Sequence, residues 1–330
     1  MMAPGLDGPA AGEARPAGAL ASAPAGIWPR VRLPFLLAFT VLAFSAIEVV
    51  ANPIRHRLEP AVMTFWRFLL GVACLVPAWL AAPRRDPPRL PVADLGRLWG
   101  LGCLNIILAM GAHAVCIKFA KASTAAILIA ANPLATNLFA WLLLGETLGW
   151  RRVGTLGVGF AGVILVALKP VPGEDTAFGI GMGLLGMAGF ALYTVLSKGI
   201  VQRLGSLRVT VVSFALGVAT YLPVLAWLGL PIRPDPDLWP RLLVLGVVVS
   251  GLGYITFFKA LAALPAGRAC LLFFAKPPVS IGLAWLLLGE RPTALAMAGT
   301  LLVMLGIGLD QKPAPAPPGW KKEETTDGHT

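Results

Sequence analysis

The sequence predicts an all-α integral membrane protein, with ten transmembrane helices forming two inverted-topology repeats of five helices each. Three observations support this prediction: the composition, a series of long apolar runs, and a duplicated sequence motif. Of the 330 residues, 57% are hydrophobic and 13% are charged, whereas soluble domains average about a quarter charged residues. A composition this apolar excludes a water-soluble globular enzyme.

Ten apolar runs of 17–23 residues follow one another along the chain. A helix needs about 20 apolar residues to cross a bilayer, whereas a membrane-barrel strand is shorter and alternates polar with apolar positions. The runs are uniformly apolar, so they predict helices. They cover residues 33–51, 61–81, 98–117, 122–144, 150–168, 177–197, 208–229, 241–262, 266–288 and 293–309.

The formal net charge of +11 would suggest nucleic-acid binding in a soluble protein. Here 17 of the Lys and Arg residues fall on one side of the predicted spans and 8 on the other, while Arg67 and Lys276 lie within spans. Basic residues concentrate in cytoplasmic loops. We therefore predict a multi-pass protein of the cell (inner) membrane, with both termini cytoplasmic and no nucleic-acid partner.

Residues 1–30 and 310–330 are rich in Pro, Ala and Gly or in polar residues, which is typical of disordered tails. Between them, residues 31–170 are expected to form the first five-helix repeat and residues 176–309 the second. The 4 cysteines and 3 histidines are scattered, so the sequence indicates no metal ligand set and no cofactor.

The repeat is visible in the sequence itself. Trp-Leu-Leu-Leu-Gly-Glu at 141–146 recurs at 285–290, an offset of 144, and Pro133 and Pro277 precede it at the same spacing. A second match, at an offset of 146, pairs Leu-Gly-Val-Ala at 70–73 with the same letters at 216–219. Because five is odd, the second unit must cross the membrane with the opposite polarity, and inverted repeats are typical of secondary transporters.

These features resemble the drug/metabolite transporter superfamily, specifically its EamA-domain transporters. The resemblance rests on the mid-span prolines followed by duplicated Gly-Glu turns, on Pro60 seven residues before Arg67, and on the small residues that begin the fourth and ninth spans. It implies a secondary transporter that moves a small polar metabolite, such as an amino acid, by alternating access, with export preferred. The central cavity would be lined by spans one to four and six to nine.

Other functions stay open at this point. A nucleotide sugar or a lipid precursor is an alternative substrate, and an integral-membrane enzyme is the rival class, although no catalytic constellation or Walker motif is present. The lipid bilayer and a small-molecule substrate are the expected partners. Small residues spaced along the fifth and tenth spans permit close helix contact, within one chain or in a homodimer.

Ionisable residues within spans are costly and are functional candidates. Glu48 and Arg67 have matching depths, so we expect them to form an ion pair or an outer gate. Lys276 and its repeat mate Asn132 are expected to face each other and contact an anionic group of the substrate. The alternative is that Lys276 pairs with Glu48 and braces the bundle.

The remaining candidates have weaker signals. His113 is expected to line the outer vestibule, or else to be an interfacial histidine with a backbone partner. Tyr193 and Trp66 are candidates for an aromatic wall against the substrate. Pro133 and Pro277 are expected to act as helix hinges, since each frees a backbone carbonyl one turn earlier. We expect the glutamates of the two Gly-Glu turns to cap the helices that follow them: Glu146 and Glu290.

Overall fold

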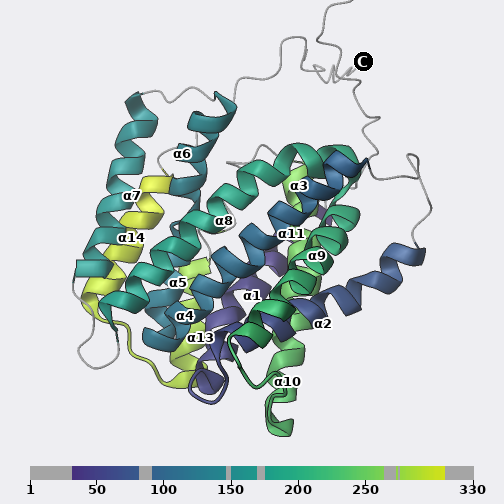
Figure 1. The fold of residues 1–330 in the computed structure, drawn as a ribbon. Coiled ribbons are helices and arrows are strands. Elements are labelled where there is room, and N and C mark those ends of the chain that lie inside the picture. The colour runs from purple at the N-terminus through teal and green to yellow at the C-terminus, as the bar shows by residue number, and fades with distance from the viewer. Residues whose placement is uncertain are drawn as a thin grey trace, which may run out of the picture.

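A computed structural model describes residues 32–81, 91–145, 150–168, 175–263, 273 and 276–308, so both predicted tails lie outside the described residues. Every regular element in these ranges is helical (Figure 1). Seven helical segments of the described chain are long and apolar enough to cross a membrane. The chain is therefore a multi-pass membrane protein.

The first half of the chain begins with two long helices joined by a short turn. Its third helical segment is continuous but changes to π-helical winding in the middle, and its fourth is divided in two. The elements are α1 (Arg32–Ala51), η1 (Asn52–Ile54), α2 (Pro60–Ala81), α3 (Val92–Gly102), η2 (Cys103–Met110), α4 (Gly111–Phe119), α5 (Ala122–Ala130), α6 (Asn132–Leu144) and α7 (Trp150–Leu168).

The second half repeats this order of features. Pro223 lies inside its second helix as Pro77 does in the first half, and its third segment again contains a π-helical stretch. The elements are α8 (Ala177–Leu204), α9 (Ser206–Trp227), η3 (Pro236–Leu238), α10 (Trp239–Leu243), η4 (Val244–Gly253), α11 (Tyr254–Ala263), α13 (Lys276–Leu288) and α14 (Ala294–Gly308).

The two Gly-Glu turns have the same backbone conformation. Gly145 ends α6 with a φ of 66°, and Gly289 follows α13 with a φ of 68°. Left-handed conformations cost little only for glycine, because it has no Cβ. The duplicated letters thus encode the same helix termination in both halves.

The halves contact each other through equivalent glycines. A Cβ added to Gly71 in α2 would lie 3.1 Å from the Cβ of Ser250 in η4, and one added to Gly217 in α9 would lie 2.8 Å from the backbone of Gly102 in α3. Gly71 and Gly217 are the glycines of the duplicated Leu-Gly-Val-Ala segment. The second helix of each half therefore packs backbone to backbone against the third segment of the other half, as small residues at membrane-helix contacts allow.

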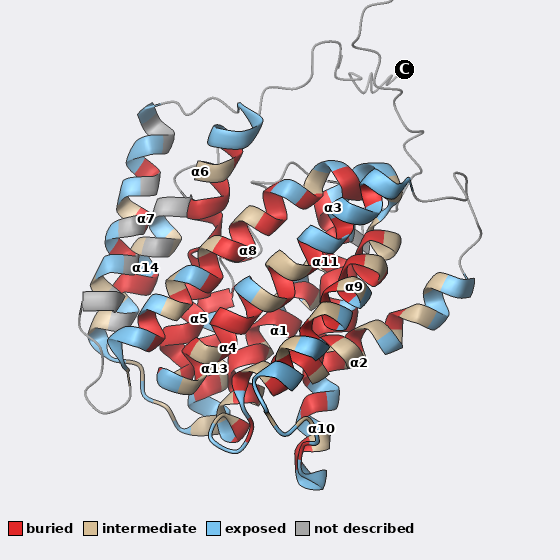
Figure 2. Cartoon of the chain, in the orientation of Figure 1, coloured by how far each residue is buried: buried red, intermediate tan, exposed pale blue. Residues whose placement is uncertain are grey.

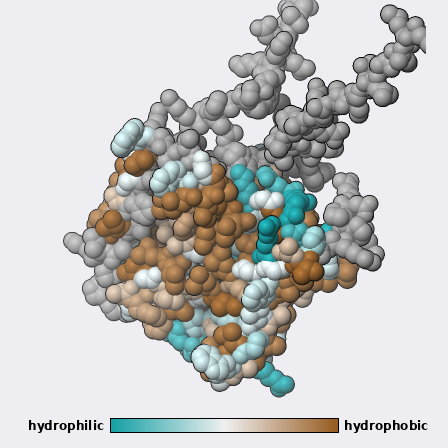
Figure 3. Space-filling model, turned by 45° about the horizontal axis from the view of Figure 1, so that its top comes forward, coloured by the Kyte–Doolittle hydropathy of each residue, from teal (hydrophilic) through white to brown (hydrophobic). Residues whose placement is uncertain are grey.

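Helices α7 and α14 pack against each other at one edge of the bundle (Figure 1). This contact lies within one chain, but it does not run through Gly154, Gly157 or Gly159 of α7: a Cβ added at Gly154 or Gly157 would meet no atom within 4 Å, and one added at Gly159 would meet Leu134 of α6. A homodimer face stays a prediction. The most buried residues lie instead where α1, α4, α5, α8 and α11 meet (Figure 2). The surface over the outer helices is mainly hydrophobic, with hydrophilic residues gathered in patches (Figure 3), as expected for a face in contact with lipid.

Candidate substrate site

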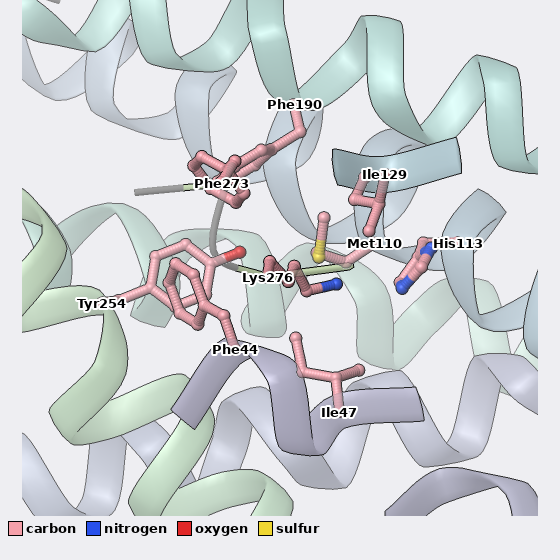
Figure 4. A pocket seen from close by; sticks show the side chains of 9 residues that line it. All are labelled: Phe44, Ile47, Met110, His113, Ile129, Phe190, Tyr254, Phe273 and Lys276. Atoms are coloured by element: carbon pink, nitrogen blue, oxygen red, sulfur yellow. The ribbon is translucent and has the colours of Figure 1, made fainter. Parts of the chain in front are cut away.

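A small cavity lies where the two halves of the chain meet (Figure 4). Its volume of about 20 Å³ has room for about one water molecule. Eight of the nine lining side chains come from α1, η2, α4, α5, α8, α11 and α13, and the ninth, Phe273, lies before α13. The nine are Phe44, Ile47, Met110, His113, Ile129, Phe190, Tyr254, Phe273 and Lys276.

Three ionisable side chains meet at this cavity. The Lys276 ammonium donates a hydrogen bond to Oε1 of Glu48, and Nε2 of His113 lies 3.0 Å from the same oxygen. Glu48, His113 and Lys276 are at most 2% exposed, and Figure 4 shows the Lys276 amino group extending toward His113. A buried charge is tolerated when an opposite charge compensates it. In this cluster the charges of Glu48 and Lys276 compensate each other.

The cluster retains unused hydrogen-bonding capacity. Among the described residues, Oε2 of Glu48 and Nδ1 of His113 are buried without a hydrogen-bond partner. Most buried polar atoms are paired in folded proteins, and an unpaired one calls for a reason. Two unpaired polar atoms beside a cavity are suited to bind a polar ligand.

The expected pair between Glu48 and Arg67 is wrong. Arg67 is buried in α2, but its Nε donates to the Ser250 hydroxyl at 2.7 Å, and its guanidinium lies near Met110 Sδ at 3.8 Å and over the Phe68 ring at 5.1 Å. Glu48 instead pairs with Lys276, which was the alternative prediction. Matching depth in the sequence favoured Arg67, and the packing of α13 against α1 brings Lys276 to Glu48 instead.

Lys276 and Asn132, which were expected to face each other, have different partners. Asn132 donates to the carbonyl of Met187 at 3.3 Å and accepts from the Thr136 hydroxyl at 3.1 Å. It therefore joins α6 to α8, and it does not line the cavity. The equivalent sequence positions of Asn132 and Lys276 do not make them neighbours, because Lys276 turns toward α1.

The two predicted wall aromatics lie outside the cavity lining. Tyr193 is fully buried against Phe258, with ring centroids 5.8 Å apart. Trp66 donates from its indole nitrogen to the carbonyl of Ile232 at 2.6 Å and packs on Trp239 with ring centroids 4.8 Å apart. Trp66 thus joins α2 to the loop before η3.

Other aromatic residues form the wall instead, and sequence reasoning missed them. Phe44 stacks on Phe273 at 6.0 Å and meets the edge of Tyr254 at 5.3 Å, while Phe190 meets Phe273 at 5.6 Å. One signal was available: Phe44 lies one helical turn before Glu48, so the two share a face of α1. The histidine prediction was closer, because His113 does line the cavity.

The two hinge candidates both lie at the beginning of a helix. Pro133 is the second residue of α6, and the turn at Ala131 separates this helix from α5. Pro277 is the second residue of α13, directly after Lys276. Proline is favoured there because the first helical N–H groups have no intrahelical acceptor. Hinge motion at these two prolines stays a prediction.

Equivalent ion pairs connect the halves at opposite ends of the bundle. After η1, Arg57 pairs with Asp237 at 2.5 Å and Asp235 at 3.0 Å, and their carboxylates raise the pKa of Arg57 above its ordinary value. At the end of α8, Arg203 pairs with Asp94 at the start of α3, at 2.5 Å. Arg57 and Arg203 differ by the repeat offset of 146, and the 22-residue helix α2 separates the two ends.

Glu290 caps a helix, but not the one that follows it. Its carboxylate accepts from the backbone N–H groups of Ala122 and Ser123 at 3.4 and 3.3 Å, and from the Asn52 amide at 3.4 Å. It therefore caps α5 of the other half, which corrects the predicted cap on α14. A carboxylate is favoured at a helix N-terminus. The equivalent Glu146 lies outside the described residues.

A family model decides what kind of protein carries this site. The model of the EamA-like transporter family matches residues 32–168 and again residues 177–309. This chain belongs to the EamA-like transporter family. The two matched stretches coincide closely with the two halves described above, and the predicted family resemblance is confirmed.

The relatives of this EamA-family chain are transporters by name. An uncharacterized transporter of Clostridium kluyveri is 26% identical over 82% of this chain and 90% of its own length, and the uncharacterized transporter YvbV of Bacillus subtilis is 26% identical over 85% and 92%. A probable terminal-alkyne amino-acid exporter of Streptantibioticus cattleyicolor is 27% identical over 73% and 80%.

A solved crystal structure shares the fold of this family member. It superposes with a TM-score of 0.64 at 20% sequence identity, over 86% of this chain and 97% of the other. The similarity supports the helical architecture.

Proposed function

We propose that this EamA-family protein is a secondary transporter that exports a small zwitterionic metabolite, an amino acid or a close analogue. The observation that carries the proposal is the Glu48–His113–Lys276 cluster beside a cavity between the two halves. The ten-span inverted-repeat topology, with both termini in the cytoplasm of a bacterial-type inner membrane, is part of the proposal.

The cluster favours a substrate that carries both charges. An amino acid presents a carboxylate to Lys276 and an ammonium to Glu48, so it can enter the ion pair and leave each buried charge with a partner. A substrate with a single negative charge would leave Glu48 unpaired, at a cost of about 3–5 kcal/mol. The aromatic wall adds apolar area and a favourable surface for an ammonium group.

A nucleotide sugar fits this site less well. Phosphates are bound by clusters of Arg or Lys, and among the described residues that line this cavity Lys276 is the one Lys or Arg, already paired with Glu48. Arg67 is directed away toward Ser250. The relative named as a probable amino-acid exporter supports the same choice of substrate class.

The cavity volume and the paired ends support alternating access. A cavity of about 20 Å³ has room for about one water molecule and so cannot hold an amino acid; the substrate therefore enters only when the halves separate at one end. The Arg57 and Arg203 ion pairs join opposite halves at the two ends. In an inverted repeat the halves rock about a midplane site, so each pair breaks when its own end opens.

The test is transport by the full-length protein in liposomes. Vesicles loaded with a panel of radiolabelled amino acids are expected to release at least one of them faster than protein-free vesicles, and excess unlabelled substrate should compete. Transport of a nucleotide sugar with no transport of any amino acid would overturn the proposal. Running the assay with and without a pH gradient distinguishes proton-coupled export from facilitated exchange.

A further inference from the structure

A groove separate from the central cavity lies between α3–η2 and the end of α8. Its volume is about 630 Å³, and the two elements lie next to each other in the fold (Figure 1). The lining residues are Arg97, Gly100, Leu101, Leu104, Leu196, Gly199, Ile200 and Arg203. None of them lines the central cavity.

Each wall of the groove is one face of a helix. On α3–η2 the lining positions are 97, 100, 101 and 104, and on α8 they are 196, 199, 200 and 203. Residues spaced by three, four and seven positions share one face of a helix. Each wall has an arginine at one end and a glycine in the middle, and its other lining residues are Leu or Ile.

The glycines keep the groove open. A Cβ added at Gly100 or at Gly199 would meet no atom within 4 Å. Both residues are exposed, and Leu196 is 49% exposed. The middle of the groove is therefore accessible space with apolar walls, on a protein whose outer surface faces lipid.

Both arginines lie at the same end of the groove, because α3 begins where α8 ends. Arg203 pairs with Asp94, which is 2% exposed, while half of the Arg203 side chain stays accessible. With Arg97 included, the three side chains carry a net charge of +1 at this end. In the predicted topology this end lies at the cytoplasmic surface of the membrane.

We propose that this groove binds an anionic phospholipid of the cytoplasmic leaflet. The headgroup phosphate would contact Arg97 and Arg203. The upper parts of the acyl chains would lie along the leucines that line the groove, Leu101, Leu104 and Leu196. Basic pockets between transmembrane helices on the cytoplasmic side suit anionic headgroups. The groove has a cationic end, apolar walls and an open middle. These three features match one amphiphilic ligand that lies across the membrane interface.

Native mass spectrometry of the full-length protein tests the proposal. Detergent-solubilised protein is incubated with equimolar phosphatidylglycerol and phosphatidylcholine, and the retained lipids are counted. We expect preferential retention of phosphatidylglycerol. Arg97→Gln should lower its affinity about fivefold, and the double change Gly100→Leu with Gly199→Leu should abolish the preference by filling the groove.

Two matched controls accompany these variants. Arg241→Gln removes the arginine that the repeat offset of 144 pairs with Arg97, and Gly96→Leu enlarges a glycine of α3 that also has open space but lies outside the groove. Both should retain phosphatidylglycerol like the unchanged protein. The proposal is overturned if the two lipids are retained equally, if Arg97→Gln and Arg241→Gln behave alike, or if the filled groove keeps its preference.

Discussion

Arg57 and Arg203 hold equivalent positions in the two halves of the chain, and each pairs with an aspartate of the opposite half. Arg57 reaches Asp237 just before α10, and Arg203 reaches Asp94 at the start of α3. Because the two pairs lie at opposite ends of α2, the same contact occurs once at each end of the bundle. In the proposed mechanism, these two pairs close the two ends between which the repeats rock.

Breaking one pair should open the end that it closes. The readout is a cysteine placed at the cavity residue Ile47 and labelled by a membrane-impermeant thiol reagent that is added outside cells. We expect Arg57→Gln to raise this labelling and Arg203→Gln to lower it. Exposed ion pairs contribute about 0.2–1 kcal/mol, which corresponds to changes of up to about fivefold. A change in the same direction for both variants would contradict the model of two alternating ends.

A charge exchange provides the matching control for the inner pair. Arg203→Asp combined with Asp94→Arg keeps an opposite pair at the same place, so labelling should return toward that of the unchanged protein. High salt should reduce the effects of all these variants, since ions screen exposed charges. Failure of the exchanged pair to restore labelling would show that Arg203 acts through other contacts.

Lys276→Ala should abolish amino-acid transport and destabilise the protein by about 3–5 kcal/mol, since it leaves the buried Glu48 without its cation. The double change Lys276→Met with Glu48→Leu removes both charges and should recover most of the stability without recovering transport. Thermal unfolding in detergent and efflux from liposomes measure the two effects. The exposed Lys259→Ala is the control, and an active double variant would exclude a role of the pair in substrate binding.

Gly102→Ala adds only one methyl group, but it should destabilise the protein strongly. An added Cβ would lie 2.0 Å from the Ser213 carbonyl oxygen in α9, so α3 and α9 would have to separate. Overpacking of this kind costs about 1–3 kcal/mol. Gly96→Ala on the same helix meets no atom within 4 Å and should be neutral or stabilising. Melting temperatures in detergent compare the two, and equal values would contradict the close crossing.

Glu290→Ala should destabilise the protein by about 0.5–2 kcal/mol, the usual cost of removing a helix N-cap. The loss arises at α5, because the Glu290 carboxylate accepts from Ala122 and Ser123 there. Glu290→Gln keeps a hydrogen-bond acceptor but removes the charge, so its stability should fall between that of the unchanged protein and that of Glu290→Ala. Hydrogen exchange of the α5 amides would reveal the position of the effect, and a change confined to α14 would show the cap to be on the following helix.

Much of the architecture was predictable because membrane helices are encoded locally. An apolar run of about 20 residues predicts a span from its own composition, and the duplicated letters at 141–146 and 285–290 predicted a repeated unit before any contact was known. Seven of the predicted spans are present among the described residues as helices long and apolar enough to cross a membrane, and the count of ten stays a prediction. The split of the fourth span at Ala131 agrees with the proline that follows it.

Partner choice was not predictable. Matching depth along the first two spans favoured Arg67 as the partner of Glu48, whereas Lys276, which lies at the middle of the ninth span, was only the alternative. The cap by Glu290 was also assigned to the wrong helix. In both cases the true partner lies more than 160 residues away, where sequence proximity gives no guidance.

The class of protein, the approximate spans, the repeat and the family could all be predicted from the sequence, because each depends on composition or on a local pattern of letters. The contacts between side chains came from the three-dimensional packing: Lys276 with Glu48 and His113, Arg67 with Ser250, and an aromatic wall of Phe44, Tyr254 and Phe273. Such contacts depend on how helices rotate and cross. Those rotations are set by the sum of many small packing interactions, and no single segment of sequence contains them.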